Sequence, residues 1–426
     1  MGTRRNLTSS AALIAALALT AAACSGDDDN NPSADDTTAA TGAEPDTETT
    51  VAGEAATGAP FTIGVVNIEG APTFDFPEFT DGFDSAAKHV NERLGGAGGR
   101  PIEIEECTAQ GTPESSQQCA QELASKDVEL VLVGLDIFTD YATFAAAGIP
   151  VVGSIPILPN DYSAEAVYLT GGNLGVMTAI TAIAKNELGA EKVGIVSSDN
   201  PAGNAGSDIL EDALTAAGID YNIVKGGDNE TDAGYQGLMR QANEGDPDAL
   251  ISLYAGPGCI GTIRARTALG IDTPVISTGL CRNKDVIDVV GDEAVGWIFA
   301  TGDDSGEQFD VMTQAIADFK GIEPDEVNTG GFTVIGFLQL MTMFEAANDV
   351  AEANGADALT GLAVYEEMKN STDRKLWPGT QPYECGQEPD YPSICTFGIQ
   401  FSEYLPGGEL ELLADGEFVD GKEYLP

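Results

Sequence analysis

Strand-like apolar segments alternate with amphipathic helical segments along most of this chain, and this alternation constrains the fold more than any other feature. Runs such as 61–67, 128–133 and 249–254 are almost continuously apolar. Strands of that kind are buried on both faces, which is typical of parallel sheets covered by helices. Two such series, 61–170 and 174–300, predict two doubly wound α/β lobes.

The individual elements follow from the hydrophobic period and from Gly and Pro stop signals. Strands are predicted over 61–67, 101–106, 128–133, 149–152, 193–197, 221–224, 249–254, 274–277 and 296–300. Helices are predicted over 80–94, 114–126, 174–188, 206–217, 235–243, 284–290, 308–319, 332–353 and 360–368, with two more ending at Gly148 and Leu269. Near the C-terminus, Leu410–Phe418 is predicted to form a hairpin that turns at Asp415-Gly416.

The N-terminus has the pattern of an export signal. Arg4 and Arg5 precede an apolar run that begins near Ala11 and ends in three alanines before Cys24. A cysteine directly after small residues resembles a bacterial lipoprotein signal. That resemblance implies that residues 1–23 are removed and that Cys24 is lipidated. An ordinary signal peptide with an incidental cysteine is the alternative, and the two arginines also permit twin-arginine export.

Residues 24–60 contain nine acidic residues, no Lys or Arg and no aromatic residue. A segment of this composition cannot bury enough apolar surface to fold, so we expect a disordered acidic tether. The whole chain carries a formal charge of −50. The body from residue 61 onward retains 60 acidic and 17 basic residues, a net charge of −43. Such a charge repels nucleic acid, which we therefore exclude as a partner.

Besides Cys24, six cysteines remain, and an even number outside the cytoplasm indicates disulfides, although six cysteines allow 15 pairings. We predict that neighbours in sequence pair, as Cys107–Cys119, Cys259–Cys281 and Cys385–Cys395. A zinc site is the competing interpretation. The chain has no C-x-x-C pair, and its one histidine, His89, is remote from every cysteine in sequence, so we predict no metal site.

Ligands of open α/β sheets bind beyond the carboxyl ends of the strands. The corresponding loops are predicted at 68–78, 134–140, 153–160, 198–206, 254–259, 278–283 and 301–306. Catalytic motifs are missing: there is no P-loop and no G-x-S-x-G elbow. The glycine run 95–99 follows a helix and precedes a strand, the reverse of a dinucleotide fingerprint. We therefore predict a protein that is not an enzyme and has no cofactor.

An ordered series of segments resembles the type 1 solute-binding proteins of ABC importers, in particular the branched-chain amino acid-binding group. The segments are Ile63–Asn67, Lys88–Asn91, Gly96–Ile102, Val133-Gly134, Ala147–Val152, Glu191–Val196, Asp248–Ser252, Ala268–Ile271, Pro274–Ser277 and Ala358–Gly361. The resemblance covers most of 61–370. It implies two lobes joined by a three-crossover hinge, with crossings near 172, 303 and 360. Lobe I is then expected over 61–172 and 303–358, and lobe II over 173–302 and 359–426.

The family's binding positions, where they carry over to this chain, give a candidate ligand-binding set. Its members are Phe74, Phe76, Asp136, Ser154, Ile155, Pro156, Ala202, Tyr254, Gly279, Arg282 and Phe332. Arg282 is suited to a carboxylate but would equally suit a surface ion pair. Asp136 is a candidate for a cationic or hydroxylated group, or for a turn or cap. Phe74 and Phe76 line the site or belong to the core of the lobe.

The resemblance departs from amino-acid recognition in its polar residues. Gly134–Ile137 stands where the family has a serine pair, and no threonine follows Ser154. The tyrosine position falls at Ala202, and the acidic position that pairs with an ammonium group falls near Gly279. These departures predict a cleft lined by apolar and aromatic residues with few polar anchors.

We therefore expect an extracytoplasmic monomer held at the cell membrane by an N-terminal lipid. It would capture a small polar organic solute, an amino acid or a related carboxylate or amide, and deliver it to an ABC permease. Closure of the two lobes would follow tighter binding to the closed state. An extracytoplasmic sensor on the same scaffold is the alternative, and an enzyme a more distant one.

Overall fold

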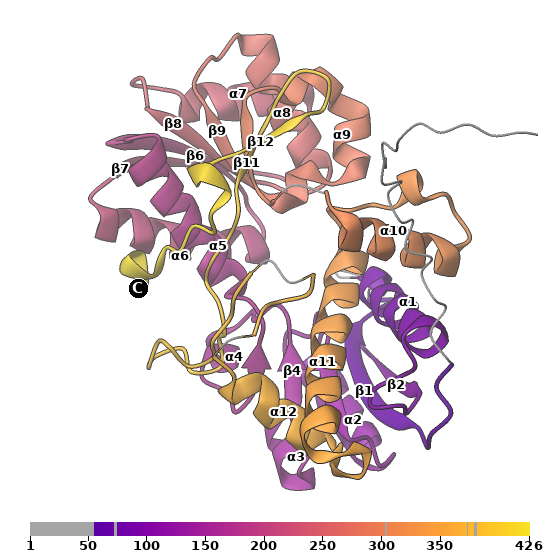
Figure 1. Ribbon diagram of the computed structural model, residues 1–426. Coiled ribbons are helices and arrows are strands. Elements are labelled where there is room, and N and C mark those ends of the chain that lie inside the picture. Colours follow the sequence, from indigo (N-terminus) through magenta and orange to yellow (C-terminus); the bar gives the residue numbers. More distant parts are fainter. Residues whose placement is uncertain (1–54, 72–74, 303–304, 373, 379–380) are drawn as a thin grey trace, which may run out of the picture. The chain divides into compact units, whose positions relative to one another are not determined.

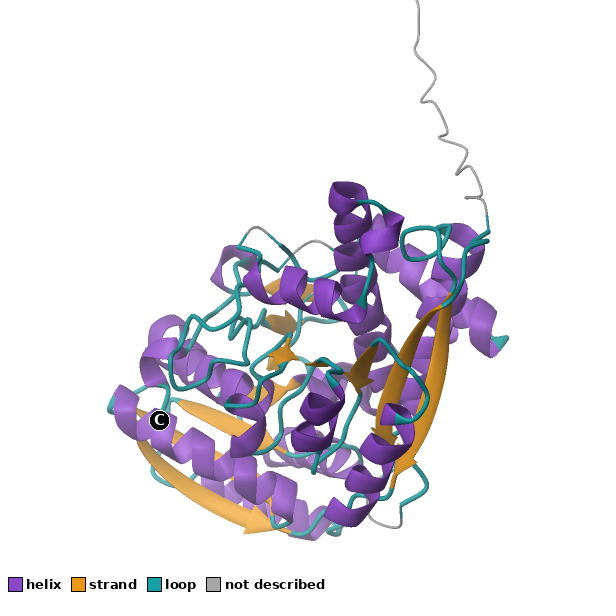
Figure 2. Cartoon of the chain, turned by 90° about the horizontal axis from the view of Figure 1, so that it is seen from below, coloured by secondary structure: helices purple, strands orange, loops and turns teal. Residues whose placement is uncertain are grey.

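The computed structural model describes residues 55–71, 75–302, 305–372, 374–378 and 381–426. The predicted signal peptide, Cys24, most of the predicted tether and Phe74 lie outside the described residues. The body contains two α/β units, the first built around a parallel sheet and the second around a mainly parallel one (Figures 1 and 2). No helix within the described ranges has the length and apolarity needed to cross a membrane.

The first sheet contains five parallel strands in the order β2-β1-β3-β4-β5. They are β1 (Phe61–Ile68), β2 (Ile102–Ala109), β3 (Leu130–Val133), β4 (Val151–Gly153) and β5 (Val167–Tyr168). Alternate residues of β3 enter the cores on opposite faces of the sheet, Leu130 and Leu132 on one and Val131 and Val133 on the other. Burial of both faces explains the continuous apolar pattern of these strands.

Helices cover both faces of this sheet. The helices are α1 (Pro77–Arg93), α2 (Pro113–Ala124), α3 (Tyr141–Ala147), α4 (Pro159–Tyr162), α10 (Glu307–Lys320), α11 (Phe332–Asn354) and α12 (Gly361–Asn370). Phe83 of α1 and Phe337 of α11 are fully buried in one core, whereas Leu123 of α2 and Phe144 of α3 lie in the other. Helix α11 thus returns from far along the chain to pack beside α1.

The second sheet has the order β12-β11-β10-β9-β8-β6-β7. Its strands are β6 (Lys192–Ser198), β7 (Asp220–Gly226), β8 (Ala249–Leu253), β9 (Val275–Thr278), β10 (Trp297–Ala300), β11 (Ser402–Tyr404) and β12 (Leu410–Leu412). Strands β6 to β10 pair in parallel. Strand β11 pairs antiparallel with β10, and β12 pairs antiparallel with β11. The covering helices are α5 (Gly172–Ala182), α6 (Pro201–Ala217), α7 (Asp232–Ala242), α8 (Pro257–Leu269) and α9 (Lys284–Val290).

The chain crosses between the two sheets three times. The first crossing lies between β5 and α5, and the second between β10 and α10. The third, predicted near 360, is wrong. Cys395 still belongs to a core of the first sheet, and Phe401 is the first residue beyond it that is buried in a core of the second.

Helix α12 explains the late third crossing, because it packs on the first sheet. Val364, Tyr365 and Met368 are buried in the core shared with α11. At the start of the helix, a Cβ built on Gly361 would lie only 1.8 Å from the carbonyl oxygen of Glu129. Residues 359–426, which the sequence places on lobe II as a whole, therefore divide their contacts between the two sheets.

The C-terminal hairpin differs from the prediction. It is formed by β11 and β12 on the edge of the second sheet. The turn lies at 405–409, where Leu405 N–H donates to the carbonyl of Glu409 at 2.8 Å and two glycines adopt positive φ. The predicted turn residues Asp415-Gly416 instead belong to a short 3₁₀ turn, Ala414–Gly416.

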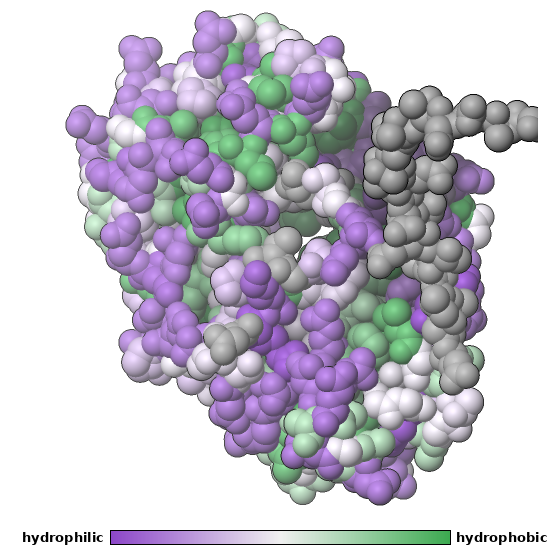
Figure 3. Space-filling view, in the orientation of Figure 1, coloured by the Kyte–Doolittle hydropathy of each residue, from purple (hydrophilic) through white to green (hydrophobic). Residues whose placement is uncertain are grey.

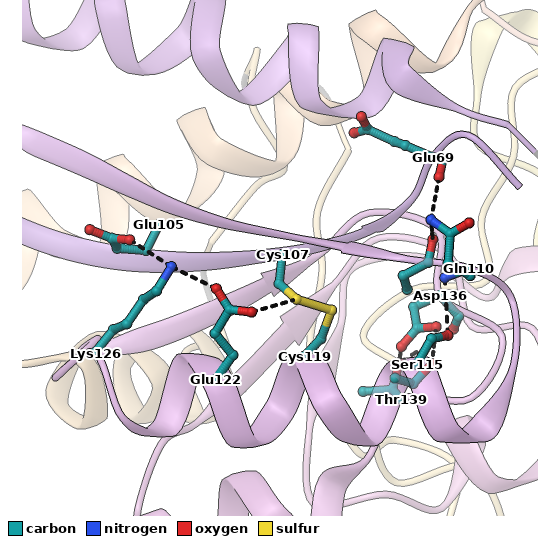
Figure 4. Close-up of a disulfide and its surroundings, with 12 residues drawn as sticks. Glu69, Glu105, Cys107, Gln110, Ser115, Cys119, Glu122, Lys126, Asp136 and Thr139 are labelled. Carbon is teal, nitrogen blue, oxygen red and sulfur yellow. Dashed lines mark hydrogen bonds and ion pairs between the residues drawn. A yellow bond between two sulfur atoms is a disulfide. The ribbon is translucent and has the colours of Figure 1, made fainter.

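All three predicted disulfides are present: Cys107–Cys119, Cys259–Cys281 and Cys385–Cys395. The first joins β2 to α2 (Figure 4). Beside it, Lys126 forms ion pairs with Glu122 at 2.9 Å and Glu105 at 3.1 Å. Hydrophilic residues predominate on the face drawn in Figure 3, as the acidic composition predicts.

Candidate functional site

The predicted binding loops all follow the carboxyl ends of parallel strands. In the first sheet they come after β1, β3 and β4, and in the second after β6, β8, β9 and β10. Sheets of this type bind ligands at that edge. These loops therefore form the candidate site, and the orientation of their side chains determines what the site can bind.

Phe76 and Phe332 lie together on the first-lobe side of the candidate site. Their ring centroids are 5.2 Å apart in an edge-to-face arrangement. On its other side, Phe332 stacks on the fully buried Phe79 at 5.0 Å. Phe76 and Phe332 are only half-buried, so each residue keeps part of its surface accessible. The structure thus brings together two residues 256 positions apart in the sequence.

Asp136, in the loop after β3, is turned away from solvent and is 2 % exposed. Its carboxylate accepts a hydrogen bond from the Ser116 hydroxyl at 2.6 Å. It accepts another from Thr139 at 3.2 Å (Figure 4). Burial raises the pKa of Asp136, and these hydrogen bonds oppose that effect. Of the two roles predicted for this residue, the contacts favour the structural one, in which it ties its own turn to α2.

The loop after β4 also presents an apolar residue and buries a polar one. The Ser154 hydroxyl donates to Gln339 Oε1 of α11 at 2.9 Å and is 3 % exposed. The Gln339 side-chain amide in turn donates to main-chain carbonyls of β3 and β4 at 3.2 and 3.0 Å. Ile155 is half-buried against the same core as Phe332, and Pro156 is buried.

On the second lobe, Ala202 is exposed in the first turn of α6. Tyr254 is 2 % exposed, and its ring meets Tyr235 edge to face at 5.7 Å. Its hydroxyl has no hydrogen-bond partner within the described part of the chain, and burial raises its pKa. Tyr254 thus belongs to a core of the second lobe. Gly279 and Arg282 lie in a half-buried 3₁₀ turn after β9.

A contact between the two lobes was not predicted. The main-chain N–H of Lys284, the first residue of α9, donates to Asn328 Oδ1 at 3.0 Å. Next to it, a Cβ built on Gly330 would lie 2.9 Å from the Cα of Asn283. The available signal was the pair of glycines at 330–331, directly before a long helix. Their lack of side chains allows the main chains of the two lobes to approach closely.

A surface hollow of about 410 Å³ lies beside the loops after β3 and β4, against the first turn of α2. Buried Asp161 lies at its edge and accepts a hydrogen bond from Tyr141 at 2.7 Å. Tyr141 also bonds to the hydroxyl of Tyr168 at 2.6 Å. Asp161 further accepts two main-chain N–H bonds, so the hydrogen bonds of its carboxylate are satisfied within the lobe.

Within the described residues, no group of three or more His, Cys, Asp or Glu side chains is arranged to hold a metal ion. The half-buried His89 lies on α1 near Phe337, and burial lowers its pKa. Neither residue belongs to the candidate binding loops. The candidate binding loops offer aromatic and aliphatic side chains, several carboxylates and one cation, Arg282.

Two parallel sheets, three crossings and binding loops at the carboxyl edges define the scaffold of a hinged solute-binding protein. The chain belongs to the periplasmic binding protein family, whose model matches residues 60–384. Proteins of this family are extracytoplasmic and bind substrates. No curated protein sequence matches the chain.

Solved structures confirm the fold. An ABC transporter substrate-binding protein from Sphaerobacter thermophilus superposes with a TM-score of 0.64 at 18 % identity, covering 85 % of this chain and 96 % of that one. A solute-binding protein from R. palustris in complex with benzoate superposes with a TM-score of 0.61 at 15 % identity, covering 85 % of this chain and 97 % of that one. A branched-chain amino acid transporter substrate binding protein from Streptococcus pneumoniae, in complex with isoleucine, superposes with a TM-score of 0.60 at 14 % identity. The match covers 85 % of this chain and 99 % of that one.

Proposed function

We propose that this protein is the solute-binding component of an ABC importer. It captures a small polar organic solute, an amino acid or a related carboxylate or amide, between its two lobes. The observation that carries this proposal is the contact of Asn328 with Lys284, which joins the segment before α11 to the turn after β9. Lys284 directly follows the predicted loop 278–283, and Asn328 lies four residues before the candidate Phe332, so a solute held there would contact both lobes.

The proposed binding residues are drawn from the candidates that remain partly accessible at this edge. On the first lobe they are Phe76, Ile155 and Phe332, joined by Phe74, which lies outside the described residues. On the second lobe they are Gly279 and Arg282. We propose that the lobes close about a hinge formed by the three crossing segments. Two of these lie near 172 and 303, and the third lies at 396–401.

Anchoring is a separate part of the proposal. Removal of residues 1–23 would leave Cys24 as a lipidated N-terminus, and the acidic segment up to residue 60 would connect it to the folded body. The protein would then remain at the outer side of the cell membrane beside its permease. Metabolic labelling with an alkyne fatty acid should label the protein, and Cys24→Ser should abolish the label. Labelling that persists in the variant would refute this part.

The binding proposal is tested by the melting temperature of the purified full-length protein against a wide panel of solutes. The panel contains amino acids, amides, aromatic and aliphatic carboxylates, polyols and nucleosides. A ligand present at 100 times its dissociation constant stabilises the folded state by about 2.7 kcal/mol. A shift of several degrees with one chemical class is expected. A panel in which no solute shifts the melting temperature would contradict solute capture.

A further inference from the structure

The ligand class can be narrowed, given the proposed binding function. We infer that the solute carries an apolar ring or branched chain and one carboxylate, and that it lacks the ammonium group of an α-amino acid. The inference depends on which side chains the first lobe presents, which it buries, and where the nearest cations of the second lobe lie.

The first lobe presents apolar side chains at each loop of its carboxyl edge. Phe76 follows β1, Leu135 follows β3, Ile155 follows β4, and Phe332 begins α11. All four are half-buried against one hydrophobic core, so each exposes part of its surface. A ligand bound against these side chains would bury its apolar surface from water. Each buried methylene contributes about 0.8 kcal/mol.

The polar neighbours of these residues are directed inward. Asp136, next to Leu135, is bonded to Ser116 and Thr139. Ser154, next to Ile155, donates to Gln339. Both side chains are less than 4 % exposed. An ammonium group at this edge would therefore have to break bonds that already stabilise the lobe, and an unpaired buried carboxylate or hydroxyl is costly.

Carboxylates in the loop after β1 are also engaged. Glu69 Oε1 accepts bonds from the Asn67 side-chain amide at 3.1 Å and from the Thr80 hydroxyl. Asp75 Oδ1 accepts the N–H of Gly70 at 2.8 Å. These bonds hold the loop against the start of α1. Glu69 and Asp75 thus serve the loop itself, whereas Glu78 is exposed in the first turn of α1.

Positive charge comes from the second lobe. Arg282 and Lys284 flank Asn283, whose Cα would lie 2.9 Å from a Cβ built on Gly330. Phe332 follows Gly330 by two residues. With consecutive Cα atoms 3.8 Å apart, the Cα atoms of Arg282 and Phe332 lie within roughly 16 Å of each other. A guanidinium with five N–H donors can hold a carboxylate in addition to other partners.

The strongly acidic body does not by itself favour a cationic ligand. At physiological ionic strength charges more than about 8 Å apart are largely screened from one another. The charges that decide ligand class are therefore those within one or two residues of the site. There Arg282 and Lys284 flank Asn283, which contacts the segment leading to Phe332, and Glu69, Asp75 and Asp136 accept hydrogen bonds within the first lobe.

Matched ligand pairs test the inference by calorimetric titration of the full-length protein. 3-Phenylpropanoate is compared with phenylalanine, and 4-methylpentanoate with leucine; within each pair only the ammonium group differs. We expect the acid to bind at least tenfold more tightly than the amino acid, equivalent to about 1.4 kcal/mol. 3-Phenylpropanamide, which lacks the negative charge, should bind more weakly than the acid.

Arg282→Gln should weaken binding of the acid at least tenfold and leave the amide unaffected. Arg264→Gln is the matched control, because Arg264 lies on the same lobe and pairs with Glu293 at 3.6 Å on the surface. Equal or tighter binding of the amino acids would overturn the inferred class while solute capture stands. If neither the acid nor the amino acid of a pair binds, the inferred ligand class is also wrong. Solute capture would then be supported only if another solute of the wider panel raised the melting temperature.

Discussion

The main-chain N–H of Lys284 and the side-chain oxygen of Asn328 form a hydrogen bond of 3.0 Å that joins the two lobes. Asn328 stands four residues before α11, and Lys284 is the first residue of α9. The bond satisfies one of the N–H groups that every helix leaves free in its first turn. It therefore contributes at once to the start of α9 and to the contact between lobes.

Asn328→Ala should weaken ligand binding by about three- to tenfold. A neutral hydrogen bond contributes about 0.5–1.5 kcal/mol, and this one joins parts that must come together in a closed complex. The dissociation constant of the tightest ligand found in the panel is the measurement. Asn370→Ala is the control, because within the described residues the Asn370 side chain bonds to Glu366 of its own helix. Equal losses in both variants would remove the special role of Asn328.

Gly361→Ala should destabilise the protein by several kcal/mol. Its Cβ would overlap the carbonyl of Glu129 at 1.8 Å, so α12 must move away from the first sheet. Gly237→Ala provides a matched control: it lies within α7, with nothing within 4 Å of its Cβ. There alanine should stabilise the protein by about 0.5–1 kcal/mol. Denaturant unfolding of the two variants should thus give shifts of opposite sign. A small effect at position 361 would contradict the packing described for α12.

The sequence predicted elements where local signals were strong. The strand predicted at 61–67 is β1 (Phe61–Ile68), because both faces of that strand are buried. The helix predicted from Gly206 begins at Pro201 instead, since Asn200 caps it and proline suits the first helical position. That earlier start places Ala202 in a helix turn.

Long-range contacts were beyond sequence reasoning. The burial of Ser154 depends on Gln339, 185 residues away in the sequence. The pairing of Phe76 with Phe332 follows from how α11 returns to α1. The third crossing was misplaced because the signal at Gly361 marks a close approach to the first sheet and not a change of lobe. Periodicity reports which residues are buried, but not what they are buried against.

Asp136→Asn should change how stability depends on pH. Burial raises the pKa of this carboxyl in the folded state, so the folded protein binds its proton more tightly than the unfolded chain does. The stability gained from protonation is complete below the unfolded pKa near 4 and is lost as pH rises through the folded value. Asparagine is neutral throughout. Relative to the wild type, the variant should therefore become progressively more stable as pH rises from about 4 to 7.

The measurement is the difference in unfolding free energy between Asp136→Asn and wild type across that range. A tenfold difference in proton affinity between folded and unfolded states corresponds to about 1.4 kcal/mol. Asp140→Asn is the control, because Asp140 is a less buried carboxylate that caps α3 through Thr143. Asparagine caps a helix about as well as aspartate, so that variant should change stability little. A flat difference for Asp136→Asn would show that its hydrogen bonds to Ser116 and Thr139 fully offset the effect of burial.

Removal of the Cys259–Cys281 disulfide should cost more stability than removal of either of the others. It closes the longest of the three loops, with a sequence separation of 22 against 12 and 10. Loop-closure entropy predicts a cost of about 2–4 kcal/mol for each bond, with about 0.7 kcal/mol between the longest and the shortest. Both cysteines of this pair are also fully buried in a second-lobe core, beside Tyr254. Paired Cys→Ser variants of each bond, compared by denaturant unfolding, should therefore rank Cys259–Cys281 first. A larger loss for Cys385–Cys395 would mean that the segment before the third crossing governs stability instead.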